Sequence, residues 1–147
     1  WPYEPESLCA RLIKAADGRD LIQLRIDLGI LQLETHGRPD GQHPQGHNTL
    51  LDCLCKQEAE DPDFELDEAT CLEVDREFVQ FYHRRVAWLR LQRFERAVQD
   101  ADHTLALMDF CRELDVAARA TPRFCTVSSY ASRRSAVDRG ASTRGRG

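Results

Sequence analysis

Apolar residues recur every three to four positions along most of the chain, which is the spacing of one face of an α-helix. The pattern predicts a helix over residues 6–16 and, after a break at Asp17-Gly18, a second helix over residues 20–35. This second segment carries two apolar stripes, one of Leu21, Leu24, Leu28 and Leu31 and one of Ile22, Ile26, Ile30 and Leu33. A helix that is apolar on two faces packs between neighbours, so we expect it to be central.

The rest of the pattern predicts three more helices. Residues 36–47 contain three Gly and two Pro and are predicted to be a loop. Asn48 or Thr49 can cap a short helix through Leu54, and an acidic loop over residues 58–67 follows. Asp67 can cap a long helix that ends near residue 92. A last helix is expected over residues 95–118, ended by Thr121-Pro122. The residues expected to be buried on the two long helices are Phe78, Phe81, Tyr82, Val86 and Leu89, and Ala97, Val98, Ala101, Leu105 and Met108. No strand pattern is recognised, so the predicted fold class is all-α with about five helices.

Two segments align with each other and suggest an internal repeat. Residues 26–33 match residues 84–91, with the small residues Gly29 and Ala87 at the same position. Small residues let antiparallel helices approach closely, as stacked hairpins require. The alternative, that two amphipathic helices align through periodicity alone, stays open.

The second of these units resembles a tetratricopeptide repeat. Over residues 81–108, Ala87-Trp88, Phe94, Ala97 and Leu105 stand at positions that match the family pattern. The chain departs from that pattern in four places, at Arg85, Ala101, Thr104 and Asp109. The resemblance implies a domain over residues 1–120 of antiparallel helical hairpins, stacked as divergent tetratricopeptide-like repeats, that binds a protein segment in a groove.

A second resemblance concerns the UVR motif of the excision-repair proteins UvrB and UvrC. Over residues 93–102, Phe94, Glu95, Ala97 and Asp102 match that motif. More broadly, residues 1–120 are similar to the N-terminal part of bacterial UvrB/UvrC-motif-containing proteins, through Trp1-Pro-Tyr, residues 37–41, residues 75–85 and residues 100–103. This implies an alternative function as an accessory factor in DNA repair or nucleic-acid binding. The resemblance stops near Arg123, where a truncation or a shifted reading frame would produce such a junction.

Composition narrows the class of protein. Hydrophobic residues make up 41% and charged residues 31%, a balance typical of a globular domain, and no transmembrane run or export signal is recognised. The six cysteines form no regular framework, so we expect reduced thiols and a cytoplasmic protein without membrane contact. The net charge of −5 is uneven, because residues 121–147 form a basic tail rich in Ser, Arg and Gly. That tail is predicted to be disordered, with at most weak nucleic-acid contact through its arginines. The acidic body argues against a nucleic-acid surface on the folded part.

Several clusters of polar residues could suggest a catalytic or metal-binding role, but a purely structural interpretation is favoured for each. His36, His43 and His47 lie near Cys53 and Cys55, yet two thiols in Cys-x-Cys on a helix point about 200° apart and cannot easily share one ion. Asp100 and His103 share a helix face, but Asp102 points elsewhere and no nucleophile accompanies them. Residues 37–41, with Pro-Asp-Gly, are typical of a turn and lack a phosphate-loop signature. We therefore predict no catalytic residue, no cofactor and no metal.

The residues predicted to contact a partner lie together on the first long helix. They are His83, Arg84, Arg85 and Trp88, a basic cluster within an aromatic stretch. The arginines could grip an acidic partner segment, or one of them could equally pair with Asp27 inside the fold. The prediction from sequence is thus a protein-interaction adaptor without catalysis.

Overall fold

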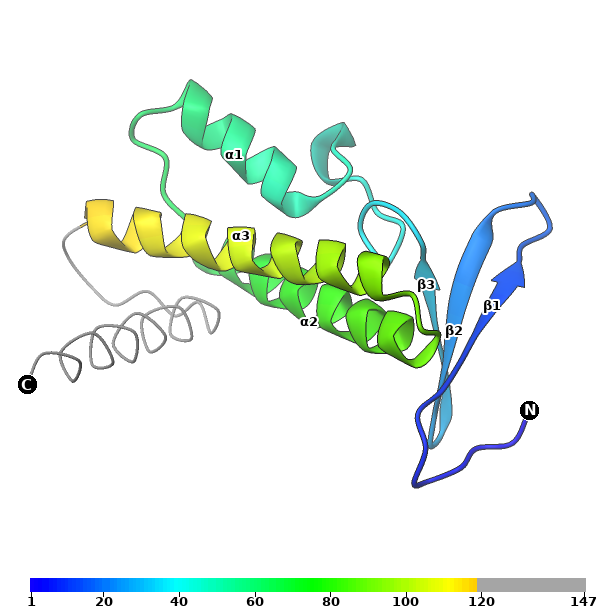
Figure 1. Ribbon diagram of the computed structural model, residues 1–147. Helices are drawn as coiled ribbons and strands as arrows, with labels where there is room; N and C mark the ends of the chain where they lie inside the picture. Colours follow the sequence, from blue (N-terminus) through cyan, green and yellow to red (C-terminus); the bar gives the residue numbers. More distant parts are fainter. Residues whose placement is uncertain (119–147) are drawn as a thin grey trace, which may run out of the picture.

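A three-stranded sheet precedes three helices in this chain (Figure 1). The computed structural model describes residues 1–118, with side chains described through residue 114. The elements are β1 (Cys9–Lys14), β2 (Asp20–Ile26), β3 (Gly29–Glu34), a short 3-10 turn η1 (Pro44–Gly46), α1 (Leu50–Glu60), α2 (Glu68–Arg90) and α3 (Phe94–Ala118). The helix stop expected at Thr121-Pro122 and the predicted tail over residues 121–147 lie outside the described residues.

The sheet overturns the prediction of an all-α fold with about five helices. The segments 6–16 and 20–35, expected to be helices, hold an antiparallel meander in the order β1-β2-β3. In the register, Ile22 lies opposite Leu33 and Leu24 opposite Leu31. Apolar and polar residues alternate over residues 22–26 of β2 and 31–34 of β3, so the strand spacing of two accounts for most of the two supposed helical stripes. The fold of the described residues is therefore mixed α and β.

The repeat prediction fails for the same reason. Gly29 starts β3 opposite Ile26 in a hairpin, whereas Ala87 is fully buried inside α2. These two residues were the supposed equivalent close-contact points, and their surroundings are unrelated. The chain does not contain stacked helical hairpins of the tetratricopeptide type, because the first supposed copy is a pair of strands.

The two long helices agree closely with the predicted boundaries, and α1 begins as predicted but runs to Glu60, into the predicted acidic loop. The Oγ1 atom of Thr49 accepts the N–H of Asp52 at 3.1 Å and caps α1, and Asp67 accepts the N–H of Thr70 at 2.7 Å and caps α2. Between α2 and α3, Gln92 adopts a left-handed conformation with φ 57°, and the N–H of Arg93 reaches the carbonyl of Trp88 at 2.9 Å. This is the hydrogen bonding of a Schellman end, which turns the chain back on itself. Among the described residues no helix is both long and apolar enough to cross a bilayer.

The cap at Asp67 gives a pH-dependent prediction. Hydrogen bonds from the side chain and the backbone of Thr70 lower the pKa of Asp67 below its ordinary value of 3.8. A carboxyl whose pKa is lower in the folded state stabilises the fold above its unfolded pKa and loses that contribution as pH falls through the folded pKa. We expect Asp67→Asn to lower the thermal midpoint at pH 7, with a gap to the wild type that closes as pH falls below 3.8. Melting curves of both proteins at pH 7 and at a pH below 3.8 check this. The same gap in thermal midpoint at the two pH values would contradict it.

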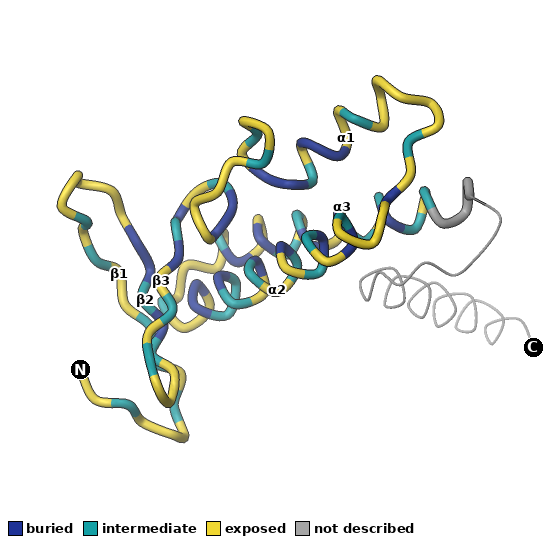
Figure 2. The backbone as a smooth tube through the Cα atoms, turned by 180° about the vertical axis from the view of Figure 1, so that it is seen from behind, coloured by how far each residue is buried: buried dark blue, intermediate teal, exposed yellow. Residues whose placement is uncertain are grey.

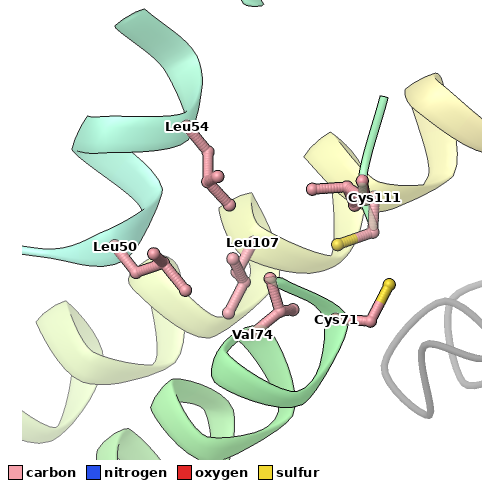
Figure 3. Packing of buried hydrophobic residues seen from close by; sticks show 7 residues of the cluster. Leu50, Leu54, Cys71, Val74, Leu107 and Cys111 are labelled. Carbon is pink, nitrogen blue, oxygen red and sulfur yellow. The ribbon is translucent and has the colours of Figure 1, made fainter. Parts of the chain in front are cut away.

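Two apolar cores hold the elements together (Figure 2). The first lies between the three helices and contains Leu50, Leu54, Leu66, Cys71, Val74, Leu107 and Cys111 (Figure 3). The second joins the sheet to the turn end of the helix pair and contains Ile22, Leu24, Leu33, Ala87, Trp88 and Ala97. The α2–α3 pair takes part in both cores, so it is the rigid axis against which α1 and the sheet are placed.

Several residues expected to be buried are instead exposed. The exposed fractions are 47% for Tyr82, 49% for Leu89, 57% for Val98 and 37% for Leu105. Phe81 and Ala97 are buried as predicted. Each long helix therefore has an apolar stripe that no other described element covers.

Candidate functional site

A pocket of about 230 Å³ lies where the loop after β3 meets α2 and α3. Its wall contains His36 from the loop, Arg84 and Trp88 from α2, and Arg96, Gln99 and His103 from α3. It adjoins the sheet-side core, because Trp88 belongs to that core, and the buried Phe81 also lines it. Residues from three separate parts of the chain thus meet at one place.

A buried ion pair forms the back of this pocket. The guanidinium of Arg84 forms a bidentate ion pair with Asp100, in which Nη2 donates to Oδ1 at 2.8 Å and Nε donates to Oδ2 at 3.0 Å. Its Nη1 atom donates to the carbonyls of Glu34 at 3.0 Å and Gly37 at 2.8 Å. Both charged side chains are 5% exposed. Arg84 therefore joins α2, α3 and the end of β3, and its positive charge is balanced by Asp100 within the fold.

A second buried carboxylate supports the pocket from behind. Glu77 is 0% exposed and accepts the N–H groups of Leu50 at 2.7 Å and Leu51 at 3.2 Å. These are the first backbone donors of α1, where a helix attracts negative charge. The Nε2 atom of His103 lies 2.9 Å from Oε1 of Glu77, and Arg38 approaches the same carboxylate at 3.7 Å. Glu77 therefore fixes the start of α1 and the orientation of His103.

His103 is held on its other side by an aromatic ring. Its imidazole stacks on Phe81 with the ring centroids 3.7 Å apart and the planes at 16°. With Glu77 on one nitrogen and Phe81 against its face, the ring has little freedom to rotate. This side of the pocket is preorganised.

Arg96 lies at the edge of the pocket. Its Nη2 atom donates to the carbonyl of Thr35 at 2.6 Å and lies 3.2 Å from Nε2 of His36. The guanidinium stands 5.3 Å from the centre of the Trp88 ring, a cation–π arrangement. Within the described part of the chain it forms no ion pair, because the nearby Asp100 pairs with Arg84. Arg96 is therefore a cation of the pocket wall that no carboxylate among the described residues neutralises.

The four residues predicted to contact a partner do not form one cluster. Arg84 and Trp88 line the pocket, although both are buried. His83 and Arg85 are partly exposed and both lie near Tyr82, with Arg85 5.5 Å from the centre of that ring. The partner of Arg84 is Asp100, so the proposed pairing of this arginine with Asp27 does not occur.

The structure also separates the residues once considered for chemistry. Asp100 and His103 bind different partners, Arg84 and Glu77, and Asp102 is exposed. Residues 37–41 form a turn, closed by the N–H of Gly41 to the carbonyl of Arg38 at 2.9 Å.

His36 lines the pocket, but the structure does not bring the other candidate metal ligands to it. Among the described residues no group of three His, Cys, Asp or Glu side chains is placed to share a metal ion. Burial raises the pKa of the Cys53 thiol, which disfavours the thiolate that a metal would need.

The residues that sequence reasoning missed are Glu77, Arg96 and Arg38. Glu77 stands on the buried face of α2, in line with Val74, Phe81 and Trp88, and a glutamate among apolar residues at helical spacing was the available signal. Arg96 carried no such signal, because its position depends on the loop after β3.

Comparisons with known proteins add no family to this picture. No protein-family model, curated protein or solved structure matches the chain.

Proposed function

We propose that the protein binds an acidic segment of a protein partner and acts without catalysis. In this proposal a carboxylate of the partner enters the pocket and pairs with Arg96. The observation that carries it is the charge of Arg96, which forms no ion pair among the described residues and lies at the mouth of a preorganised pocket. The side-chain amide of Gln99 adds a donor beside it.

The size of the pocket supports a single side chain as the occupant. Pockets for whole small molecules are about 300–1,000 Å³, and this one is about 230 Å³. A carboxylate with its short aliphatic stem fits that space, and the Trp88 ring provides an apolar wall for the stem. The rest of the partner segment would then lie on the surface outside.

The charge of the chain supports a protein partner over nucleic acid. The net charge is −5 and the basic tail contributes positively to it, so the body is markedly acidic. Phosphate backbones are held by extended basic surfaces, whereas one cation at a small pocket suits one carboxylate. An accessory role in nucleic-acid binding is therefore the alternative, and the experiment below separates the two.

The absence of catalysis is supported by the use of the titratable groups. Asp100 and Glu77 are both buried. The carboxylate of Asp100 pairs with Arg84, and that of Glu77 contacts His103 and accepts a backbone N–H at the start of α1. No serine or cysteine lies in the wall of the pocket beside a free base. The arrangement can hold an anion but has no evident nucleophile.

Amide NMR on the full chain tests the proposal. The probe is a short blocked peptide with two glutamates flanked by leucines, compared with the same peptide carrying glutamines. We expect the glutamate peptide alone to shift the amides of Gly37, Arg96 and Gln99. Arg96→Met keeps the aliphatic stem over Trp88 but removes the charge, so we expect at least about tenfold weaker binding from the loss of a charged hydrogen bond.

Arg93→Met is the matched control, because Arg93 is an exposed arginine less than one turn away and outside the pocket wall. It should leave the peptide affinity unchanged. Equal shifts with both peptides, or an equal loss in both variants, would overturn the proposal. Salt-dependent shifts on adding a DNA duplex, without any response to the peptide, would favour the nucleic-acid alternative.

A further inference from the structure

The apolar stripes of α2 and α3 that no other described element covers are together called the open face. It consists of Leu72, Val79, Tyr82, Val86 and Leu89 on α2 and Phe94, Val98 and Leu105 on α3. Leu72, at 65%, and Phe94, at 61%, are the most exposed of these. Contiguous exposed apolar surface of this kind marks a contact site.

Helix geometry places both stripes on the same side of the helix pair. Glu77 on α2 faces the start of α1, and His103 on α3 contacts Glu77. At about 100° per residue, Val79 lies about 200° round its helix from Glu77, and Leu105 lies about 200° round its helix from His103. The stripes therefore point away from α1, which Figure 1 shows along one side of the α2–α3 pair.

The contacts between the two helices fix which residues of the open face are level with each other. Arg84 pairs with Asp100, and Phe81 stacks on His103. In an antiparallel pair aligned in this way, Val79 is level with Leu105, and Val86 is level with Val98. These two layers of the open face therefore each contain one apolar residue from each helix.

Charges of opposite sign line the two outer edges of this face. On the outer edge of α2 stand Arg76 and Arg90 with His83 between them, and on the outer edge of α3 stand Glu95, Asp102 and Asp109. Some of these charges also have partners within the fold: Arg76 lies 3.1 Å from Glu73 and Asp109 lies 3.0 Å from Arg112, each along its own helix, and Arg90 donates to the carbonyl of Leu8 at 2.7 Å. Both sets repeat every seven residues, the period that keeps side chains on one edge of a long helix. The same alignment puts Arg76 near the level of Asp109, His83 near Asp102 and Arg90 near Glu95.

We infer that the open face binds a second copy of this chain, forming an antiparallel four-helix bundle. A two-fold axis parallel to the helices preserves level and lays α2 of each copy against α3 of the other. Val79 then meets Leu105 of the second copy, and Val86 meets its Val98. The basic edge of each α2 meets the acidic edge of the opposite α3, as the self-complementary patch of a two-fold interface requires.

The area of the face is sufficient for a stable dimer. A helix of 23 residues such as α2 is about 35 Å long, and two neighbouring helices are about 20 Å wide, so the face offers about 700 Å². Stable interfaces bury about 600–1,000 Å² on each partner, so this area falls within the usual range. The pocket lies on the other side of the helix pair, so dimerisation leaves the proposed peptide site open and uses none of its residues.

Sedimentation velocity over a range of concentrations tests the inference on the full chain. We expect a species of twice the chain mass of 16.8 kDa. Val86→Glu places a charge at the centre of the interface in both copies and should weaken dimerisation by at least about 100-fold. Leu28→Glu is the control, because Leu28 is 96% exposed at the sheet hairpin, and it should leave the dimer intact.

Charge exchange tests the arrangement independently of any effect of Val86→Glu on folding. Arg76→Glu and Asp109→Arg each set like charges together twice per dimer, and we expect about tenfold weaker association for each. The two together restore opposite charges and should recover the wild-type affinity. A wild-type protein that is monomeric at every concentration would overturn the inference. So would a double variant that fails to recover the wild-type affinity, or a folded Val86→Glu variant that dimerises as well as the wild type.

Discussion

Arg84→Met should destabilise the fold by about 3–5 kcal/mol, because it leaves the carboxylate of Asp100 buried without a counter-charge. It also removes the donor to the carbonyls of Glu34 and Gly37, so the end of β3 loses its link to the helix pair. Methionine fills much of the arginine stem, so the loss comes mainly from charge and hydrogen bonding. Urea titration of the full chain, followed by circular dichroism, measures the free energy of unfolding.

A second variant separates the ion pair from packing. In Arg84→Met/Asp100→Leu both charges are replaced by apolar side chains, and the cost of an unpaired carboxylate disappears. We expect the double variant to be more stable than Arg84→Met alone by at least about 2 kcal/mol, since apolar replacements of buried pairs are often neutral. A double variant as unstable as the single one would show that the two carbonyl contacts, and not the ion pair, are the main contribution of Arg84.

Glu77→Leu should cost a comparable amount, about 3–5 kcal/mol, and should act first on α1. The buried carboxylate is the acceptor for the N–H groups of Leu50 and Leu51, and it also holds His103 and lies near Arg38. Its removal leaves several buried donors without an acceptor, each of which costs free energy. Hydrogen exchange should show the amides of α1 losing protection before those of α2 and α3.

Glu73→Leu provides the matched control for this variant. Glu73 lies one turn from Glu77 on α2 and also contacts Arg38, at 2.8 Å, but its side chain is 41% exposed. We expect a cost of at most about 1 kcal/mol, as is typical of a partly exposed ion pair. Equal costs for the two substitutions would contradict the role assigned to burial at Glu77.

The parts of the fold that were predicted correctly are those with local signals. Thr49 and Asp67 are strong capping residues, so the starts of α1 and α2 were expected where they are observed, and the helical spacing also gave α3 close to its observed bounds. The end of α1 at Glu60 was not expected, because residues 58–67 were predicted to be an acidic loop. The sheet was missed because short apolar runs fit both periods. The segment with Ile22, Leu24 and Ile26 alternates like a strand, yet added leucines also produce stripes at helical spacing.

The candidate pocket could be predicted only in part. Arg84 and Trp88 were singled out, since a basic and aromatic cluster on a helix is visible in the sequence. Their partners were not predicted, because Arg96 contacts Thr35 and His36 across about 60 positions of the chain. Contacts at that separation depend on the path of the loop after β3, which no local pattern specifies.

Taken alone, the order of residues determined where the helices begin and end, because caps, turns and periodicity act over a few neighbouring positions. Only the tertiary structure decided that residues 9–34 pair as strands, that Asp100 is the partner of Arg84, and that no element within the described residues covers one face of the α2–α3 pair. The physical reason is that strand pairing, buried charge compensation and solvent exposure each depend on groups far apart in the chain. These contributions to the free energy of folding arise only once the whole domain is assembled.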